Sequence, residues 1–216
     1  MDNTLFDFTT AKHTACRSVT DYLGRDDSRT LYEYFRRPVH GYESHEHIRD
    51  FLVDHSLYHE AVFKRCCCIY EEQKLKAVLP FPGMSDTLEA LIMKNLMLGV
   101  VTDAHAHHAR SRLGKTGLLA YFPVVVTTEM TGQKKPSPAP FLLALALLGA
   151  SPGETVLVGD SLRREIEPGI GLGLITAHAA YGDPGPRDYS ACRPDYILKD
   201  VADILTIDEI LALPDH

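Results

Sequence analysis

Thr155-Val156-Leu157-Val158-Gly159-Asp160-Ser161 is a short apolar run that leads directly into a glycine, a carboxylate and a hydroxyl. A run of this length without alternating polar residues is typical of a strand buried on both faces of a parallel sheet. Similar runs occur at residues 97–102, 123–127 and 172–176. The sequence therefore predicts a parallel sheet, with Asp160 at the carboxyl end of one strand.

Segments with helical spacing of apolar residues, each with a turn signal near one end, separate these runs at residues 85–94, 104–114, 138–148 and 161–169. A loop over residues 182–194 and a last short strand at 196–198 follow. Strands that alternate with helices predict an α/β fold with a doubly wound, Rossmann-like parallel sheet. Ligands of such sheets bind beyond the carboxyl ends of the strands.

Residues 12–79 differ in kind, because Tyr, His, Arg and Glu alternate there with apolar residues at helical spacing and no β-branched run occurs. We expect an inserted α-helical cap over this range and a core made of residues 1–11 and 80–216. A cap joined near the ligand edge of the sheet would act as a lid. Its polar cluster is a candidate for contacting a substrate, with a solvated helix end as the ordinary alternative: Arg36, Arg37, His40 and Tyr42.

Composition narrows the class of function. The 216 residues are 45% hydrophobic and 24% charged, which is typical of a globular protein. A net charge of -7 opposes binding to nucleic acid or to an anionic membrane, so a small molecule is the expected partner. The longest apolar stretch, residues 141–150, is too short to span a bilayer, and no leader precedes it. Five cysteines, three of them adjacent, predict reduced thiols and a cytoplasmic protein.

Three polar residues follow predicted strands in positions that suit phosphoryl transfer. That chemistry needs a metal, a fixed cation and donors aimed at the phosphoryl oxygens. Asp160 could bind the metal, Lys135 could supply the cation and Thr102 a hydroxyl donor. Each lies at or just beyond the carboxyl end of a predicted strand, so spacing and topology agree.

The ordered motifs Asp2-Asn3-Thr4, Thr102, Lys-Pro-Ser-Pro-Ala-Pro-Phe at 135–141 and Gly-Asp-Ser-Leu-Arg-Arg-Glu at 159–165 resemble the haloacid dehalogenase-like (HAD) superfamily, specifically its helical-cap phosphatases. The resemblance covers nearly the whole chain. It implies a Mg²⁺-dependent phosphomonoester hydrolase that acts on a small phosphorylated metabolite through an aspartyl-phosphate.

The resemblance also implies a role for each matching residue. Asp2 matches the acid that protonates the leaving oxygen and later activates water, and its backbone carbonyl would bind Mg²⁺. Thr102 and Lys135 would hold the phosphate, with Asp103 beside them as a further substrate-binding candidate. Asp160 would bind the metal.

Glu165 matches the second acid of the last motif, where the family usually has Asp. The extra methylene could turn a direct metal contact into a water-mediated one.

The chain departs from the family pattern at its start. The attacking Asp would sit immediately before Met1, and the strand of about five apolar residues that delivers it would lie at the centre of the sheet. Without that strand both neighbouring strands would be unpaired. We interpret Met1 as a misassigned start within Asp-Met-Asp-Asn-Thr. If Met1 is the true start, the alternative is a catalytically inactive phosphate-binding or regulatory module.

Other interpretations stay open. A haloacid dehalogenase or a phosphosugar mutase ranks third, because dehalogenases typically lack the acid that Asp2 represents and need no metal.

Each candidate site residue also has an ordinary structural role, such as a helix cap for Asp2 or Thr102 and a solvated surface charge for Lys135 or Glu165. His105, His107 and His108 predict a polar helix face rather than a zinc site. No feature indicates an oligomeric state.

Overall fold

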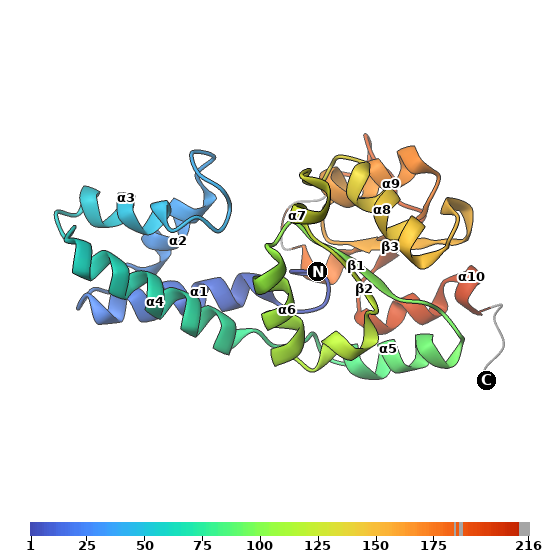
Figure 1. Ribbon diagram of the computed structural model, residues 1–216, viewed down its shortest axis with the longest axis horizontal. Helices are drawn as coiled ribbons and strands as arrows, with labels where there is room; N and C mark the ends of the chain where they lie inside the picture. Colours follow the sequence, from blue (N-terminus) through green and yellow to red (C-terminus); the bar gives the residue numbers. More distant parts are fainter. Residues whose placement is uncertain (184, 186–187, 212–216) are drawn as a thin grey trace. The chain divides into compact units, whose positions relative to one another are not determined.

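The computed structural model describes residues 1–183, 185 and 188–211, and it divides into two compact units (Figure 1). One unit contains residues 1–7 and 80–216, and the other contains residues 8–79. The helical unit begins four residues before the expected boundary at Lys12, because helix α1 already starts at Phe8. Part of the predicted 182–194 loop, at 184 and 186–187, lies outside the described residues.

The helical unit contains α1 (Phe8–Tyr22), α2 (Ser28–Arg36), α3 (Glu46–Asp54) and α4 (Glu60–Ala77). α1 packs along α4 and also against α2. The apolar faces of all four helices meet in one core, in which the rings of Phe35 and Tyr70 stack with their centroids 4.6 Å apart. Each large apolar side chain buried in this way contributes about 2 kcal/mol. The helical unit therefore has its own hydrophobic core.

The other unit alternates strands and helices. Its first half contains α5 (Met84–Met93), β1 (Gly99–Val101), α6 (Ala106–Lys115), η1 (Leu118–Tyr121), β2 (Val124–Val126), α7 (Thr128–Thr131) and α8 (Ala139–Leu148). Its second half contains η2 (Pro152–Glu154), β3 (Val156–Gly159), the π-helical turn η3 (Leu162–Ile166), α9 (Glu167–Leu172), β4 (Ile175–Ala179), η4 (Ala180–Gly182), β5 (Tyr196–Leu198), η5 (Val201–Thr206) and α10 (Asp208–Leu211).

All strand pairs are parallel, which confirms the predicted α/β class. β1 pairs with β2, and β3, β4 and β5 form a second sheet in that order. Figure 1 shows α8 and α9 on one side of the strands and α5 on the other. The run predicted as a strand at 172–176 is shifted to 175–179, because α9 continues to Leu172 and Gly173 ends it with φ 75°.

The sheet is in two pieces. Among the described residues, β1 pairs only with β2 and β3 only with β4, so each has one unpaired edge. Residues 1–7 form a turn instead of a strand, in which the Met1 carbonyl accepts hydrogen bonds from the backbone N–H groups of Thr4 and Leu5. The expectation that two strands would lack a neighbour is confirmed.

None of the described helices combines the length and the apolar character that crossing a bilayer requires.

Candidate functional site

The N-terminal turn carries Thr4 to the carboxyl end of β3. The Oγ1 atom of Thr4 donates to Oδ1 of Asp160 at 3.2 Å, and the Thr4 carbonyl accepts from the hydroxyl of Tyr181 at 2.8 Å. The carbonyl of Asn3 approaches Gly182 so closely that a Cβ atom there would overlap it. Gly182 is therefore required where the turn passes η4.

Asp2 points to a partner that sequence reasoning missed. Its Oδ2 atom accepts from Nη1 of Arg112 on α6 at 2.9 Å, and the Arg112 side chain is only 2% exposed. Oδ1 of Asp2 is buried and has no hydrogen-bond partner among the described residues. No local pattern in the sequence signals this pair, because 110 residues separate its members and the burial of Arg112 is visible only in the structure.

Lys135 and Glu165 form a buried ion pair beyond the ends of β1 and β3. Nζ of Lys135 lies 2.5 Å from Oε1 of Glu165 and also donates to the carbonyl of Val101, the last residue of β1, at 3.4 Å. Oε2 of Glu165 accepts from the backbone N–H of Ser161 at 3.0 Å. Since Ser161 lies just past β3, the carboxyl ends of β1 and β3 meet at one edge. This agrees with the predicted ligand edge.

A glycine makes room for Glu165. A Cβ atom at Gly159, the last residue of β3, would lie 2.5 Å from both Cβ and Cγ of Glu165. The Glu165 side chain thus fills the space that a larger residue at position 159 would occupy.

The two acids beside Lys135 have pKa values shifted in opposite directions. Burial and the neighbouring charge of Glu165 raise the pKa of Asp160. Burial would also raise the pKa of Glu165, but the positive charges of Lys135 and Arg164 outweigh it and hold that pKa below its ordinary value. The site therefore favours one carboxylate paired with the ammonium and a second that lacks a full counter-charge.

These acids suit a divalent cation in their chemistry. Carboxylate oxygens are the ligands that Mg²⁺ prefers, and a cation between Asp160 and Glu165 would relieve the repulsion that raises the pKa of Asp160. The carboxylate of Asp2 is held by Arg112 instead. Within the described part of the chain, no group of three or more His, Cys, Asp or Glu side chains is placed to hold a metal ion.

Thr102 and Asp103 follow β1 directly. Oγ1 of Thr102 accepts from the backbone N–H of Ala104 at 3.2 Å, in the turn that precedes α6. The N-cap position of α6 is His105, so Thr102 does not cap that helix. Oδ1 of Asp103 accepts from the backbone N–H of Lys135 at 2.9 Å and so joins the loop before α8 to the end of β1. Nη1 of Arg164 lies 3.7 Å from Oδ2 of Asp103, and its Nη2 lies 3.9 Å from Oδ2 of Asp160.

His178, near the end of β4, contacts the backbone of Asp160. It is fully buried, its Nε2 lies 3.1 Å from the Asp160 carbonyl, and its Nδ1 lies 2.9 Å from the hydroxyl of Tyr189. His178 was not predicted at the site, because the apolar run indicates a strand that ends at residue 176. A strand extended to Ala179 would have placed a histidine near a carboxyl end.

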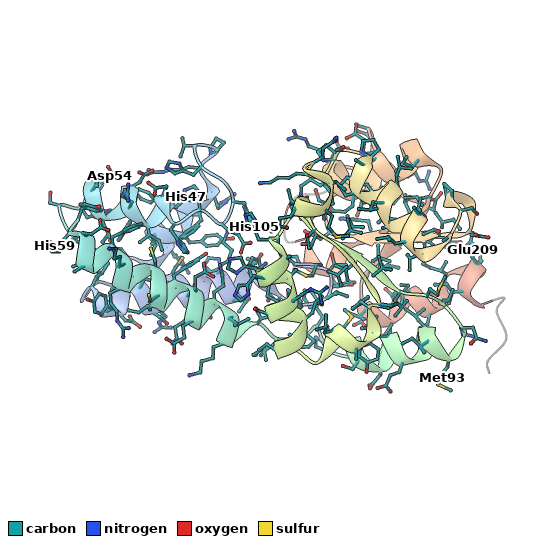
Figure 2. The ribbon with its side chains drawn as sticks, in the orientation of Figure 1. His47, Asp54, His59, Met93, His105 and Glu209 are labelled. Atoms are coloured by element: carbon teal, nitrogen blue, oxygen red, sulfur yellow. The ribbon has the colours of Figure 1, made fainter. Side chains whose placement is uncertain are left out.

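The histidines at the start of α6 have other contacts. His105, labelled in Figure 2, lies just before α6, and its Nδ1 is 2.8 Å from Oε1 of Glu129. The rings of His107 and His108 lie 5.6 Å apart.

All four members of the polar cluster have contacts within the helical unit. Arg36 pairs with Glu33, Arg37 with Asp54 and His40 with Asp50, and Nζ of Lys12 lies 3.6 Å from the centroid of the Tyr42 ring.

Comparisons with known proteins identify the family of this chain. The family model described as "Haloacid dehalogenase-like hydrolase" matches residues 1–178. Pyrophosphatase PpaX of Oceanobacillus iheyensis is 35% identical over 130 residues, which is 60% of this chain and 60% of the relative. The chain is thus matched over less than two thirds of that relative's length.

Solved structures match over nearly the whole chain. The HAD phosphatase from Thermococcus onnurineus has a TM-score of 0.67 at 25% identity and covers 100% of this chain and 97% of its own. A Bacillus subtilis protein described as the HAD-hydrolase YfnB, solved bound to magnesium, has a TM-score of 0.71 at 19% identity and covers 95% and 94%. The second match concerns the fold alone.

The family model spans the N-terminal turn, the helical unit and the strand ends that carry Lys135 and Asp160. The chain therefore belongs to the haloacid dehalogenase-like hydrolase family.

Proposed function

We propose that this chain forms a Mg²⁺-dependent phosphomonoester hydrolase that acts on a small phosphorylated metabolite through an aspartyl-phosphate. The observation that carries the proposal is the buried cluster of Lys135, Glu165 and Asp160 at the shared end of β1 and β3. The names of the Oceanobacillus pyrophosphatase and the Thermococcus phosphatase support hydrolytic release of phosphate, from a phosphoanhydride in the first case. We place the enzyme in the cytoplasm, in keeping with five free cysteines.

Lys135 and Thr102 would hold the phosphoryl group. An ammonium has three donors, and two of those on Lys135 already meet Glu165 and the Val101 carbonyl, so the third could reach a phosphoryl oxygen. The hydroxyl of Thr102 accepts one hydrogen bond and keeps its own proton to donate. Fixed donors of this kind stabilise the charge that develops during phosphoryl transfer.

Asp2 would move the proton. An aspartate joined to the Met1 nitrogen would attack phosphorus through a carboxylate oxygen, and the bond from phosphorus to the ester oxygen would break. Asp2 gives its proton to that leaving oxygen, then takes a proton from the water that attacks the aspartyl-phosphate and releases phosphate. Arg112 holds Oδ2 of Asp2, which leaves the buried Oδ1 to carry the proton.

Asp160, Glu165 and the backbone carbonyl of Asp2 would hold Mg²⁺, which would neutralise charge on the phosphoryl oxygens. Oε1 of Glu165 already accepts from Nζ of Lys135 at 2.5 Å, so Glu165 would contact the ion through water.

The test is release of phosphate from p-nitrophenyl phosphate and from pyrophosphate, with and without Mg²⁺, by the protein that carries an aspartate before Met1. Lys135→Ala should lose activity at least about 100-fold, whereas Lys134→Ala, at the neighbouring exposed lysine, should keep it. Absence of Mg²⁺-dependent turnover would refute the proposal. Phosphate binding without turnover would indicate the inactive phosphate-binding module. Release of halide would indicate a haloacid dehalogenase, and an isomerised sugar phosphate would indicate a phosphosugar mutase.

A further inference from the structure

α8 is apolar on every face. Residues 139–150, which contain α8 and its C-cap, include no charged side chain. α8 packs against β1 and β2, and its buried residues are Pro140, Phe141, Ala144 and Leu145. A helix on the surface of a globular protein normally carries polar side chains on its outer face, and a helix that is apolar all round is normally buried. The composition of α8 is therefore that of a helix with a second partner.

The outer face of α8 exposes a stripe of apolar side chains. Leu142 is 48% exposed and Leu147 is 51% exposed. Ala146 is also exposed, and Leu143 is half-buried. Residues three and four positions apart are neighbours on a helix surface, so these four residues form one continuous surface, which we call the α8 stripe. Contiguous exposed apolar surface on a soluble protein marks a site of interaction.

The α8 stripe is complementary to itself. In an antiparallel pair of α8 helices whose two-fold axis lies midway between Leu142 and Leu147, Leu142 of one copy lies beside Leu147 of the other. The same axis places Leu143 of each copy against Ala146 of the other, so that a large side chain meets a small one. Such a contact uses the same surface on both copies and closes at two. The antiparallel arrangement also brings opposite ends of the two helix dipoles together.

Opposite charges lie at the two ends of the α8 stripe. Lys134 is exposed in the loop before α8, where its carbonyl accepts from the backbone N–H of Ser137 at 2.9 Å. Glu154 is exposed at the other end, where its Oε1 atom accepts from the backbone N–H of Ser151 at 2.9 Å, just past the C-cap Gly149.

The two-fold axis turns these end charges into complementary pairs. Lys134 and Glu154 lie at nearly equal distances along the chain on either side of the axis, so each would approach the opposite charge of the second copy. An anionic lipid surface would instead be repelled by Glu154 and by the net charge of -7. The charges therefore favour a second copy of this chain as the occupant.

We propose that the α8 stripe is the interface of a symmetric dimer, in which α8 of one copy packs antiparallel on α8 of a second copy. One helix face is small beside the about 800 Å² that each partner contributes to a stable interface. The dimer is therefore weak and reversible, with a dissociation constant of roughly 10–200 µM. This inference does not depend on the proposed reaction.

Sedimentation velocity of the 216-residue chain, from about 5 to about 500 µM, measures the dissociation constant of the dimer. Leu142→Glu and Leu147→Glu should each raise it at least about tenfold, because each would bury carboxylates against leucine side chains. Met93→Glu is the matched control and should leave it unchanged. Met93 is 58% exposed on α5, which lies on the other side of the strands, and it is labelled in Figure 2. Equal melting temperatures of the three variants would show that each is folded.

A charge exchange tests the antiparallel arrangement. Lys134→Glu should raise the dissociation constant at least about threefold, because it places like charges together at both ends of the stripe. The double variant Lys134→Glu with Glu154→Lys restores opposite charges in both pairs, so its dissociation constant should return to that of the parent.

Three results would overturn the proposal. A chain that stays monomeric at about 500 µM has no such dimer, and binding of that monomer to vesicles of phosphatidylcholine and phosphatidylglycerol would assign the α8 stripe to a membrane surface. A dimer that Leu142→Glu and Leu147→Glu leave unchanged uses another face of the molecule. A double charge variant that dimerises no better than Lys134→Glu excludes the antiparallel arrangement. Phosphate release enters none of these measurements, so their outcome and that of the proposed reaction are separate.

Discussion

The Nζ atom of Lys135 lies 2.5 Å from Oε1 of Glu165, and the two side chains are only 6% and 5% exposed. Lys135 precedes α8, which packs on β1 and β2, whereas Glu165 lies in η3, which packs on β3. The ion pair therefore connects the β1–β2 sheet to the β3–β4–β5 sheet at the edge where Asp160 also lies. Removing one partner would leave the other charge buried without compensation.

Lys135→Ala should lower the free energy of unfolding by about 3 kcal/mol, because it leaves Glu165 as an unpaired buried carboxylate. The double variant Lys135→Met with Glu165→Met should recover much of this loss, since it removes both charges. Urea denaturation of the two variants, with Lys134→Ala as the exposed control, measures the difference. Equal stabilities of Lys135→Ala and Lys134→Ala would contradict the buried pair.

Gly159→Ala should displace Glu165, because the new Cβ atom would lie 2.5 Å from its Cβ and Cγ. Overpacking of this kind costs about 1–3 kcal/mol. If the proposed reaction is correct, turnover should also fall at least about tenfold. Gly153→Ala is the matched control, because a Cβ atom there meets nothing within 4 Å. Thermal unfolding and phosphate release, measured for both variants, test these two effects. A Gly159→Ala variant as stable and active as Gly153→Ala would refute the prediction.

Arg112→Met should reduce kcat more than it raises KM, because Nη1 of Arg112 holds the carboxylate of Asp2, the proposed proton donor. Loss of a hydrogen-bonded partner from a charge pair costs about 2 kcal/mol or more. Arg110→Met, an exposed position on the same helix, should behave like the parent. Steady-state kinetics with p-nitrophenyl phosphate separate kcat from KM. A change in KM alone would assign Arg112 to binding.

The helical unit should lose stability at alkaline pH through His45. A hydrogen bond with Cys67, followed by one with Glu71, raises the pKa of His45 to about 9. Since this pKa is above its ordinary value of 6.5, the stabilisation is complete below about pH 6.5 and is lost as pH rises through about 9. The side chain is 40% exposed, so we expect less than about 1 kcal/mol.

The measurement compares the parent with His45→Gln by urea denaturation at pH 6 and pH 10. The parent should be the more stable at pH 6, and the two should converge at pH 10. His59→Gln, on the same unit, serves as a control for loss of a histidine without the Glu71 contact. A difference that is the same at both pH values would show that His45 acts by packing alone.

Much of the fold could be predicted from local patterns. Continuous apolar runs indicated the parallel strands, helical spacing indicated the helical unit, and the strand at 196–198 lies where it was expected. The shift of β4 arose because Gly173 and Leu174 continue the apolar run without belonging to the strand. Local composition does not mark where a helix C-cap ends and a strand begins.

The fold class, the family and the order of Thr102, Lys135 and Asp160 along the strand ends could be predicted from the sequence, because apolar runs and short motifs are local properties. The contact of Arg112 with Asp2 and the pairing of Lys135 with Glu165 emerge only on folding, because these partners lie 110 and 30 residues apart in the chain. Packing of distant segments sets the distances between charges and the shape of voids, and no local pattern encodes either.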